Sequence, residues 1–303
     1  MHDTIENIIA ATGRIILGKE PQIRLALACL LARGHLLIED LPGMGKTTLS
    51  HTLAQVLGLA FSRVQFTSDL LPADVLGVSV YDRNSASFKF HPGPVFTNVL
   101  LADEINRATP KTQSALLEVM EESQVTLEGE TRKLPQPFFV IATQNPAHHI
   151  GTYPLPESQL DRFLMRIALG YPDNAAEREL LKDHGGRSHV PQIEPCSDAS
   201  RLLELQQAVR QVRVSDALLD YLQALLAYTR SSGRYAAGLS PRAGLALKHC
   251  AQAWALMQGR DFVLPEDVQA VLPGVAGHRL RSASDMDNLH DEAEHLLDAV
   301  PIP

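Results

Sequence analysis

Short apolar runs alternate with helical stretches over the first part of the chain, from about residue 35 to 170. Most of these runs are nearly continuously apolar and show no alternation of inward and outward residues, although polar residues interrupt Ser62–Phe66. Continuous apolar runs are typical of strands that are covered on both faces, so they predict a largely parallel α/β sheet. The predicted strands are His35–Glu39, Ser62–Phe66, Val99–Asp103, Phe138–Thr143 and Leu164–Leu169.

The pattern changes beyond about residue 195. Leucines and other apolar residues there recur at roughly helical spacing, and the strand signal disappears. The helices are expected to end near Gly233, Gly259 and Pro273, because glycine and proline commonly stop helices. The second part of the chain is therefore predicted to be a small helical domain.

The change in pattern divides the chain into two units. Residues 1–190 are predicted to form the α/β domain, and residues 195–303 the helical domain. The stretch 183–197 is rich in Gly, Pro and Ser, which is typical of a linker. Apolar residues at helical spacing over Asp285–Val300 predict a last helix, docked on the helical domain or on a neighbouring molecule.

Two segments of the α/β domain, about 76–92 and 124–137, indicate inserted β-hairpins. In each, residues of alternating character flank a short polar turn, over 82–86 in the first and 128–130 in the second. A sheet covered by helices does not need them. They are either solvent-exposed loops without a function or functional loops.

Composition narrows the class of protein. The chain has 303 residues, of which 45% are hydrophobic and 20% charged, which is typical of a soluble globular protein. Its net charge of −8 repels nucleic acid and anionic membranes. The three cysteines lie far apart and form no CxxC, so neither disulfides nor a zinc site are expected. No run approaches the ~18 apolar residues of a membrane span, so we expect a cytoplasmic protein without membrane insertion.

A predicted strand, a glycine-containing turn and a helix follow one another around residues 36–57. Phosphate oxygens need converging backbone N–H groups without intervening Cβ atoms, which Gly43 and Gly45 allow. Lys46 would then bring a positive charge to the β- and γ-phosphates, and Thr47 a hydroxyl to Mg²⁺. This order of elements predicts a nucleotide-binding loop.

The loop departs from the usual phosphate-loop pattern at one position, where Asp40 stands in place of the first glycine. Asp tolerates left-handed backbone better than most residues, so the turn remains possible. An incidental glycine turn before a helix is the alternative. The predicted phosphate-binding residues are Asp40, Pro42, Gly43, Met44, Gly45, Lys46, Thr47 and Thr48.

Polar residues also end two of the other predicted strands. One strand ends in Asp103, followed by Glu104, and Asn145 comes at the end of another. Parallel strands expose their carboxyl ends to one crevice, so these side chains are expected to face the nucleotide. There Asp103 suits Mg²⁺, Glu104 suits polarisation of an attacking water, and Asn145 can orient that water. A turn-forming Asn-Pro is the alternative for Asn145.

These motifs, in this order, resemble those of the AAA+ ATPases, and more narrowly the MoxR family within the helix-2-insert group. The resemblance covers about residues 5–280. Its most specific pieces are LLIEDLPGMGKTTL, FTSDLLPADVLG, FHPGPVFTNVLLADEINRATPKTQSALLEVMEE, QNP and YPLPESQLDRFLM. The family has the same Asp-x-Pro-Gly loop, which makes Asp40 a family trait. The resemblance therefore implies an AAA+ core with a parallel five-stranded sheet, followed by an all-α lid.

The resemblance also implies roles for seven residues. Arg162 corresponds to the arginine finger and Arg242 to sensor 2. The others correspond to Walker A (Lys46, Thr47), Walker B (Asp103, Glu104) and sensor 1 (Asn145).

The two arginines also have a physical rationale. Ser240 as N-cap and Pro241 at the first helical position would fix Arg242 in the first turn of a lid helix. Arg162 lies before the last strand, at the edge of the sheet, where a neighbouring subunit can reach it. For both, a surface salt bridge is the alternative. Arg107 is a further candidate for a subunit interface.

The leading hypothesis is an ATP-hydrolysing, Mg²⁺-dependent ring that remodels a protein client. The resemblance implies that this ring is a homo-oligomer, a hexamer. In the family that client is often a protein with a von Willebrand factor A domain. The alternatives are a nucleic-acid-stimulated motor like the MCM group and a nucleotide-switched scaffold without catalysis.

The charge of the two hairpins bears on the choice between these hypotheses. Two basic residues and one acidic residue give the first hairpin (78–90) a net charge of +1, and two of each give the second hairpin a net charge of 0. Neither is a basic track for phosphates, so nucleic acid is not expected. His148 and His149 are expected to be a solvated pair.

Overall fold

A computed structural model describes residues 1–84, 86–145, 151–182, 193–282 and 289–302 of the chain. The His148–His149 pair, most of the predicted linker and the start of the predicted last helix lie outside these described residues. Among the described residues, no helix is long and apolar enough to cross a membrane.

The centre of the molecule is a five-stranded sheet in which all the strands are parallel, as the sequence predicted. Its order is β2-β5-β8-β1-β9, so the strand that precedes the glycine loop has a neighbour on each side. Leu36 at the start of β1 pairs with Ile141 on one side and Met165 on the other. The strands are β1 (Leu36–Glu39), β2 (Phe61–Gln65), β5 (Val99–Asp103), β8 (Phe139–Gln144) and β9 (Met165–Ile167).

Both faces of the sheet are covered, which explains why the inner strands are almost continuously apolar. Leu36 and Ile38 of β1 belong to a large apolar core that includes the first three helices, whereas Leu37 belongs to a second core on the opposite face. Each burial of a large aliphatic side chain contributes roughly 1.5–3 kcal/mol, so the two cores fix the sheet in place. The covering helices are α1 (His2–Gly13), α2 (Glu20–Leu31) and α3 (Lys46–Val56) on one face and α4 (Pro72–Leu76) and α5 (Pro110–Glu122) on the other.

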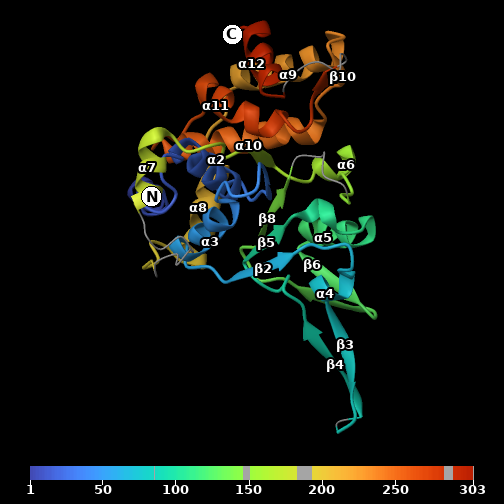
Figure 1. Cartoon of the computed structure of the whole chain (residues 1–303). Helices are drawn as coiled ribbons and strands as arrows, with labels where there is room; N and C mark the ends of the chain where they lie inside the picture. The colour runs from blue at the N-terminus through green and yellow to red at the C-terminus, as the bar shows by residue number, and fades with distance from the viewer. Residues whose placement is uncertain (85, 146–150, 183–192, 283–288, 303) are drawn as a thin grey trace.

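Two antiparallel hairpins interrupt the α/β pattern. The first, β3 (Gly77–Asp82) with β4 (Ser87–Pro92), extends far from the body of the molecule (Figure 1). The second pairs β6 (Gln124–Leu127) with β7 (Glu130–Lys133). Its turn has two residues, one fewer than the sequence suggested, because Glu128 and Gly129 take φ values of 54° and 81°. Two left-handed residues make the tight turn that matches the twist of a hairpin.

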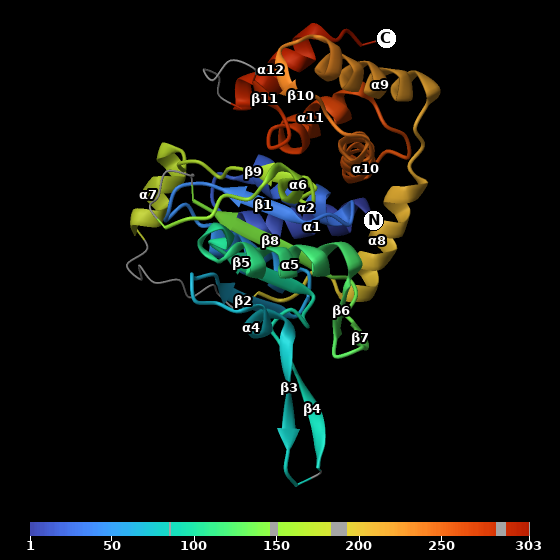
Figure 2. The same cartoon turned by 90° about the vertical axis from the view of Figure 1, so that its right-hand side faces the viewer.

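The C-terminal helices gather on the side of the sheet where β9 is the outermost strand, whereas α8 lies beside the core (Figure 2). The helix α10 packs against α2 and α8, so the larger core is continuous with this helical group. The remaining helices are η1 (Ile105–Arg107), α6 (Glu157–Leu160), α7 (Asn174–Lys182), α8 (Ala199–Gln211), α9 (Asp216–Ser231), α10 (Pro241–Met257), α11 (Pro265–Ala276) and α12 (Leu289–Ala299).

Two sequence expectations for this region are wrong. Pro273 does not end a helix but lies inside α11, near its end, where the fully buried Val271 and Val275 hold the segment in place. A proline inside a helix loses a hydrogen bond and costs about 3 kcal/mol, and the apolar packing around this segment offsets that cost. Strand structure also does not stop at residue 195, since β10 (Tyr235–Ala237) pairs with β11 (Arg281–Ser282).

Candidate functional site

The loop between β1 and α3 owes its shape to two glycines. Gly43 and Gly45 have φ values of 85° and 86°, which side-chain-bearing residues rarely adopt. A Cβ atom at either position would meet no atom within 4 Å, so backbone strain and not crowding requires glycine here. The loop therefore leaves open space next to Gly43 and Gly45.

Asp40 contributes to the loop by hydrogen bonding, not by the left-handed backbone that the sequence suggested as possible. It is absent from the positions with positive φ. Its Oδ1 accepts a hydrogen bond from the Leu41 N–H at 2.8 Å, and its Oδ2 accepts one from the Gly170 N–H at 2.7 Å. The carboxylate thus closes its own turn and ties the loop to the segment that follows β9.

The start of α3 forms a site that can accept an anion. Gly45 is the N-cap and provides no side-chain hydrogen bond to the helix. The first N–H groups of a helix have no partners within the helix, and its dipole favours negative charge at this end. The geometry fits a phosphate group. Of the other predicted loop residues, Pro42 is exposed, and Met44 and Thr48 are half-buried.

Lys46 is buried at the centre of the loop, with 8% of its surface exposed. Its Nζ donates to the Asp40 carbonyl oxygen at 2.6 Å and to Asn145 Oδ1 at 2.9 Å. Burial lowers the pKa of this amine, and four surrounding carboxylates, Asp40 first among them, oppose the shift. These carboxylates favour the charged form, which is the form that binds phosphate.

Asp103 ends β5 next to the helix that begins at Lys46. Its Oδ2 lies 3.5 Å from the Thr47 hydroxyl, and its Oδ1 accepts a hydrogen bond from the Thr143 hydroxyl at 2.6 Å. The Oδ2 atom is also paired with Arg63, at 2.6 Å from Nη2. Mg²⁺ prefers oxygen ligands and is often held by one carboxylate and a hydroxyl together with phosphates. Thr47 and Asp103 fit this ligand set.

Glu104 has an unusual backbone for a residue other than glycine, with a φ of 56°. Its N–H donates to the Thr143 hydroxyl at 2.8 Å. Its carboxylate accepts hydrogen bonds from three side chains: Asn145 at 3.0 Å, Gln65 at 2.9 Å and Arg107 at 2.8 Å. A left-handed glutamate is a strained conformation of the kind that concentrates at functional sites. Its carboxylate is held at the mouth of the loop, where a general base could act.

Asn145 joins the two charged groups of the site. Its Oδ1 accepts from Lys46, and its Nδ2 donates to Glu104. Its own carbonyl oxygen accepts a hydrogen bond from Asn106 at 3.2 Å. The structure therefore brings Lys46, Thr47, Asp103, Glu104 and Asn145 together at the carboxyl ends of the strands.

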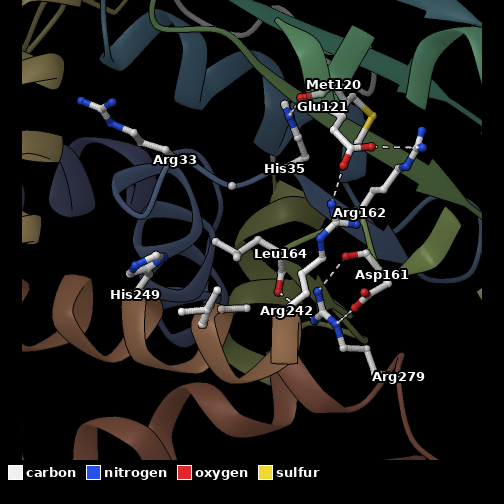
Figure 3. A pocket seen from close by; sticks show the side chains of 13 residues that line it. Arg33, His35, Met120, Glu121, Asp161, Arg162, Leu164, Arg242, His249 and Arg279 are labelled. Carbon is white, nitrogen blue, oxygen red and sulfur yellow. Dashed lines mark hydrogen bonds and ion pairs between the residues drawn. The ribbon is translucent and has the colours of Figure 1, made fainter. Parts of the chain in front are cut away.

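Arg162 and Arg242 lie together at a different place. Their side chains converge on Glu121 beside a cavity of about 240 Å³ (Figure 3). Arg242 Nη2 is 2.5 Å from Glu121 Oε1, and Arg162 Nη2 is 3.1 Å from Oε2. As predicted, the Ser240 hydroxyl caps α10 by accepting from the Ala243 N–H at 3.1 Å.

The arginine cavity and the phosphate loop lie at opposite ends of the strands. We call these ends the amino edge and the carboxyl edge of the sheet. Gly34 and His35 immediately precede β1, Leu164 immediately precedes β9, and all three line the cavity. The cavity is therefore at the amino ends of these strands. The loop follows the carboxyl end of β1, a strand of four residues that spans about 13 Å. The two arginines of one chain therefore do not face the phosphate loop of the same chain.

Arg107, considered for a subunit interface, contacts Glu104 of its own chain, and about half of its side chain is exposed. Sequence reasoning missed Arg63, Gln65, Thr143 and Glu121. A signal existed for two of them: Arg63 and Gln65 are long polar residues two positions apart in the edge strand β2, so they share one face.

Comparison with known proteins places the chain in a family. Residues 35–165 match the ATPase family associated with various cellular activities, and residues 227–298 match the AAA lid domain. The chain is 44% identical to the chaperone MoxR1 of Mycobacterium tuberculosis, over 91% of this chain and 75% of that protein. The chain belongs to the MoxR family of AAA+ ATPases. It is also 43% identical to the YeaC protein of Bacillus subtilis, over 100% of this chain and 96% of that protein.

A solved structure agrees with this assignment to the MoxR family. The crystal structure of a protein from Cytophaga hutchinsonii superimposes with a TM-score of 0.91 at 36% identity, over 100% of this chain and 96% of that one. The AAA+ fold with a helical lid is thereby confirmed. Membership of an ATPase family implies nucleotide binding and, in general terms, ATPase activity.

Proposed function

We propose that the protein hydrolyses ATP at the interface between neighbouring subunits of a ring, a hexamer by the family resemblance, and uses this to remodel a protein client. The observation that carries the proposal is the separation of the two groups of side chains. The phosphate loop and its acids lie at the carboxyl edge of the sheet, and the two arginines at the amino edge.

At the carboxyl edge, we assign each side chain a role from its contacts. Lys46 and the N–H groups at the start of α3 bind the β- and γ-phosphates. Thr47 and Asp103 hold Mg²⁺, which neutralises phosphate charge when bound. Glu104 accepts hydrogen bonds from three side chains, which hold its carboxylate in place. We assign it the role of polarising the attacking water. Asn145 orients the Glu104 carboxylate and the Lys46 amine, because it is hydrogen-bonded to both.

At the amino edge, Arg162 and Arg242 serve the nucleotide of the neighbouring subunit. Transfer of a γ-phosphoryl group spreads negative charge over its oxygens, and an arginine supplied by another subunit stabilises that charge. Both arginines are partly exposed, with 30% and 49% of their side chains accessible. They can therefore reach an adjoining subunit.

The test is the dependence of activity on assembly. ATP turnover per subunit should rise steeply with protein concentration, along with the oligomer fraction measured by sedimentation velocity. A monomer obtained by dilution should still bind ATP but turn it over at least about 10²-fold more slowly, because it lacks the arginines of a neighbour. Full turnover by a sedimentation-defined monomer would contradict the proposal.

The first hairpin supports a protein client over nucleic acid. Val78, Val80, Tyr81 and Phe88 are large apolar residues on it that are about half exposed or more. An exposed apolar surface marks protein recognition, whereas nucleic acid needs basic residues. We therefore propose a protein client, of which a von Willebrand factor A domain protein is the family's usual example. Phe88→Ser should leave basal ATP turnover unchanged and reduce stimulation by such a client, and added DNA should not stimulate turnover at any salt concentration.

A further inference from the structure

Glu121 is the meeting point of three elements. It lies near the end of α5, Arg162 lies after α6, and Arg242 begins the lid helix α10. Each carboxylate oxygen of Glu121 pairs with a different arginine, Oε1 with Arg242 and Oε2 with Arg162 (Figure 3). Two guanidinium groups repel one another, so a shared carboxylate is what lets them stand side by side.

The Glu121 pairs are not needed to attach the lid to the core. The lid residue Arg279 is almost completely buried and pairs with Asp161 at 2.6 Å. It also donates from Nη2 to the Phe163 carbonyl oxygen at 2.7 Å. The Ser240 hydroxyl approaches Asp161 Oδ2 at 3.4 Å. These contacts hold the lid independently, so removing the Glu121 charge should leave the fold intact.

The carboxylate occupies the place that a phosphate oxygen pair could take between the two arginines. Arginine recognises carboxylates and phosphates with the same planar set of donors. We propose that Glu121 is a positioning residue: it holds Arg162 and Arg242 as a preset pair, which is then presented to the γ-phosphate of the neighbouring subunit's ATP. This inference rests on the proposed action of both arginines across the subunit interface.

The first test compares Glu121→Gln with Glu122→Gln. Glu122 is the next residue of α5 and is exposed, so its substitution makes the same change of charge without a neighbouring arginine pair. Glu121→Gln should lower kcat about tenfold, with the KM for ATP and the Kd measured on dilute subunits changed by about twofold or less. Both variants should assemble and melt like the parent. The double variant Glu121→Gln/Arg162→Ala should lose less activity than the product of the two single losses, because both substitutions disturb the same arginine pair.

Mixed rings locate the defect. Glu121→Gln subunits mixed with Lys46→Ala subunits should regain turnover, because an intact loop then meets an intact arginine pair. Mixed with Arg162→Ala subunits they should show no gain over the average turnover of the two variants, because no subunit supplies a preset pair. The reverse pattern, or turnover of Glu121→Gln equal to or above that of Glu122→Gln, would overturn the inference. If Arg162→Ala itself keeps full activity, the proposed function fails, whereas an inactive Arg162→Ala beside an active Glu121→Gln refutes only the role of Glu121.

Discussion

The two edges of the central sheet differ in how their charges are satisfied. At the carboxyl edge, Lys46, Asn145 and Glu104 form one connected chain of hydrogen bonds, with Asp103 beside it. At the amino edge, two arginines share a single carboxylate, Glu121, and both remain partly exposed. Within the residues that the structure describes, neither arginine is linked to the loop.

This difference indicates which part of the chemistry one subunit supplies by itself. A connected set of buried and half-buried side chains is pre-organised, so it costs little free energy of reorganisation when the ligand binds. A pair of cations at the opposite edge can act only on a ligand brought by another molecule. We therefore expect changes at the carboxyl edge to affect the subunit that carries them, and changes at the arginines to affect its neighbour.

The largest effect should come from the carboxyl edge. Glu104→Gln keeps the shape of the side chain but removes its ability to attract a proton from water, so turnover should fall about 10²–10⁴-fold. ATP binding, measured by titration calorimetry, should stay within a few-fold of the parent. Glu118→Gln, an exposed position on α5, is the matched control. Turnover at the parent rate under saturating ATP would show that Glu104 has been wrongly assigned.

A somewhat smaller effect is expected for Lys46→Ala, and on binding rather than on the chemical step alone. Loss of a charge-assisted hydrogen bond costs roughly 1.5–3 kcal/mol, so the Kd for ATP should rise about 10- to 100-fold. The same substitution at Lys111, which is exposed on α5, should leave the Kd unchanged. Equal affinity of the Lys46 variant and the parent would remove the loop from the nucleotide site.

A still smaller effect, on stability alone, should arise at the amino edge from His35. Its Nδ1 accepts from the Val140 N–H at 2.9 Å, and its Nε2 lies 2.9 Å from the Met120 carbonyl oxygen. Burial lowers its pKa to about 4. The unfolded chain, with a His pKa near 6.5, takes up the proton first as the pH falls, so the stability due to neutral His35 is complete above about pH 6.5 and is lost toward pH 4.

The measurement for His35 is urea denaturation at pH 7 and pH 5. The buried histidine should account for about 2 kcal/mol of the loss of stability between them. His35→Gln retains a donor and an acceptor but does not titrate, so its loss should be smaller by that amount. His91→Gln, on the exposed hairpin, should behave like the parent. An unchanged pH dependence in His35→Gln would show that the folded protein accommodates the charged ring.

The sequence predicted the sheet well because its three inner strands, β1, β5 and β8, are buried on both faces. All five apolar runs became parallel strands, with ends within about two residues. It failed at Pro273 and at β10 and β11, where tertiary packing decides the local structure. A proline surrounded by buried apolar neighbours can stay inside a helix, and strands of two or three residues carry almost no periodic signal.

The site was predicted where chain order determines it, and missed where pairing in space does. The residues after β1, β5 and β8 meet because parallel strands end at the same edge. The partners Arg63 and Thr143 become visible only through the register of β2, β5 and β8. Glu121 could not be paired with two arginines from the sequence, because these residues lie about 40 and 120 positions away along the chain.

The most direct test of the separation between the two edges is a mixing experiment with two inactive variants. Arg162→Ala subunits keep the loop and lack one arginine, and Lys46→Ala subunits keep both arginines and lack the loop lysine. After sedimentation shows that both variants assemble and form mixed rings, ATP turnover is measured across mixing ratios. The account predicts little turnover from either variant alone and a maximum at intermediate ratios, because some interfaces then pair an intact Lys46 with an intact Arg162. No recovery at any ratio in rings shown to be mixed, or full activity of Arg162→Ala alone, would contradict it.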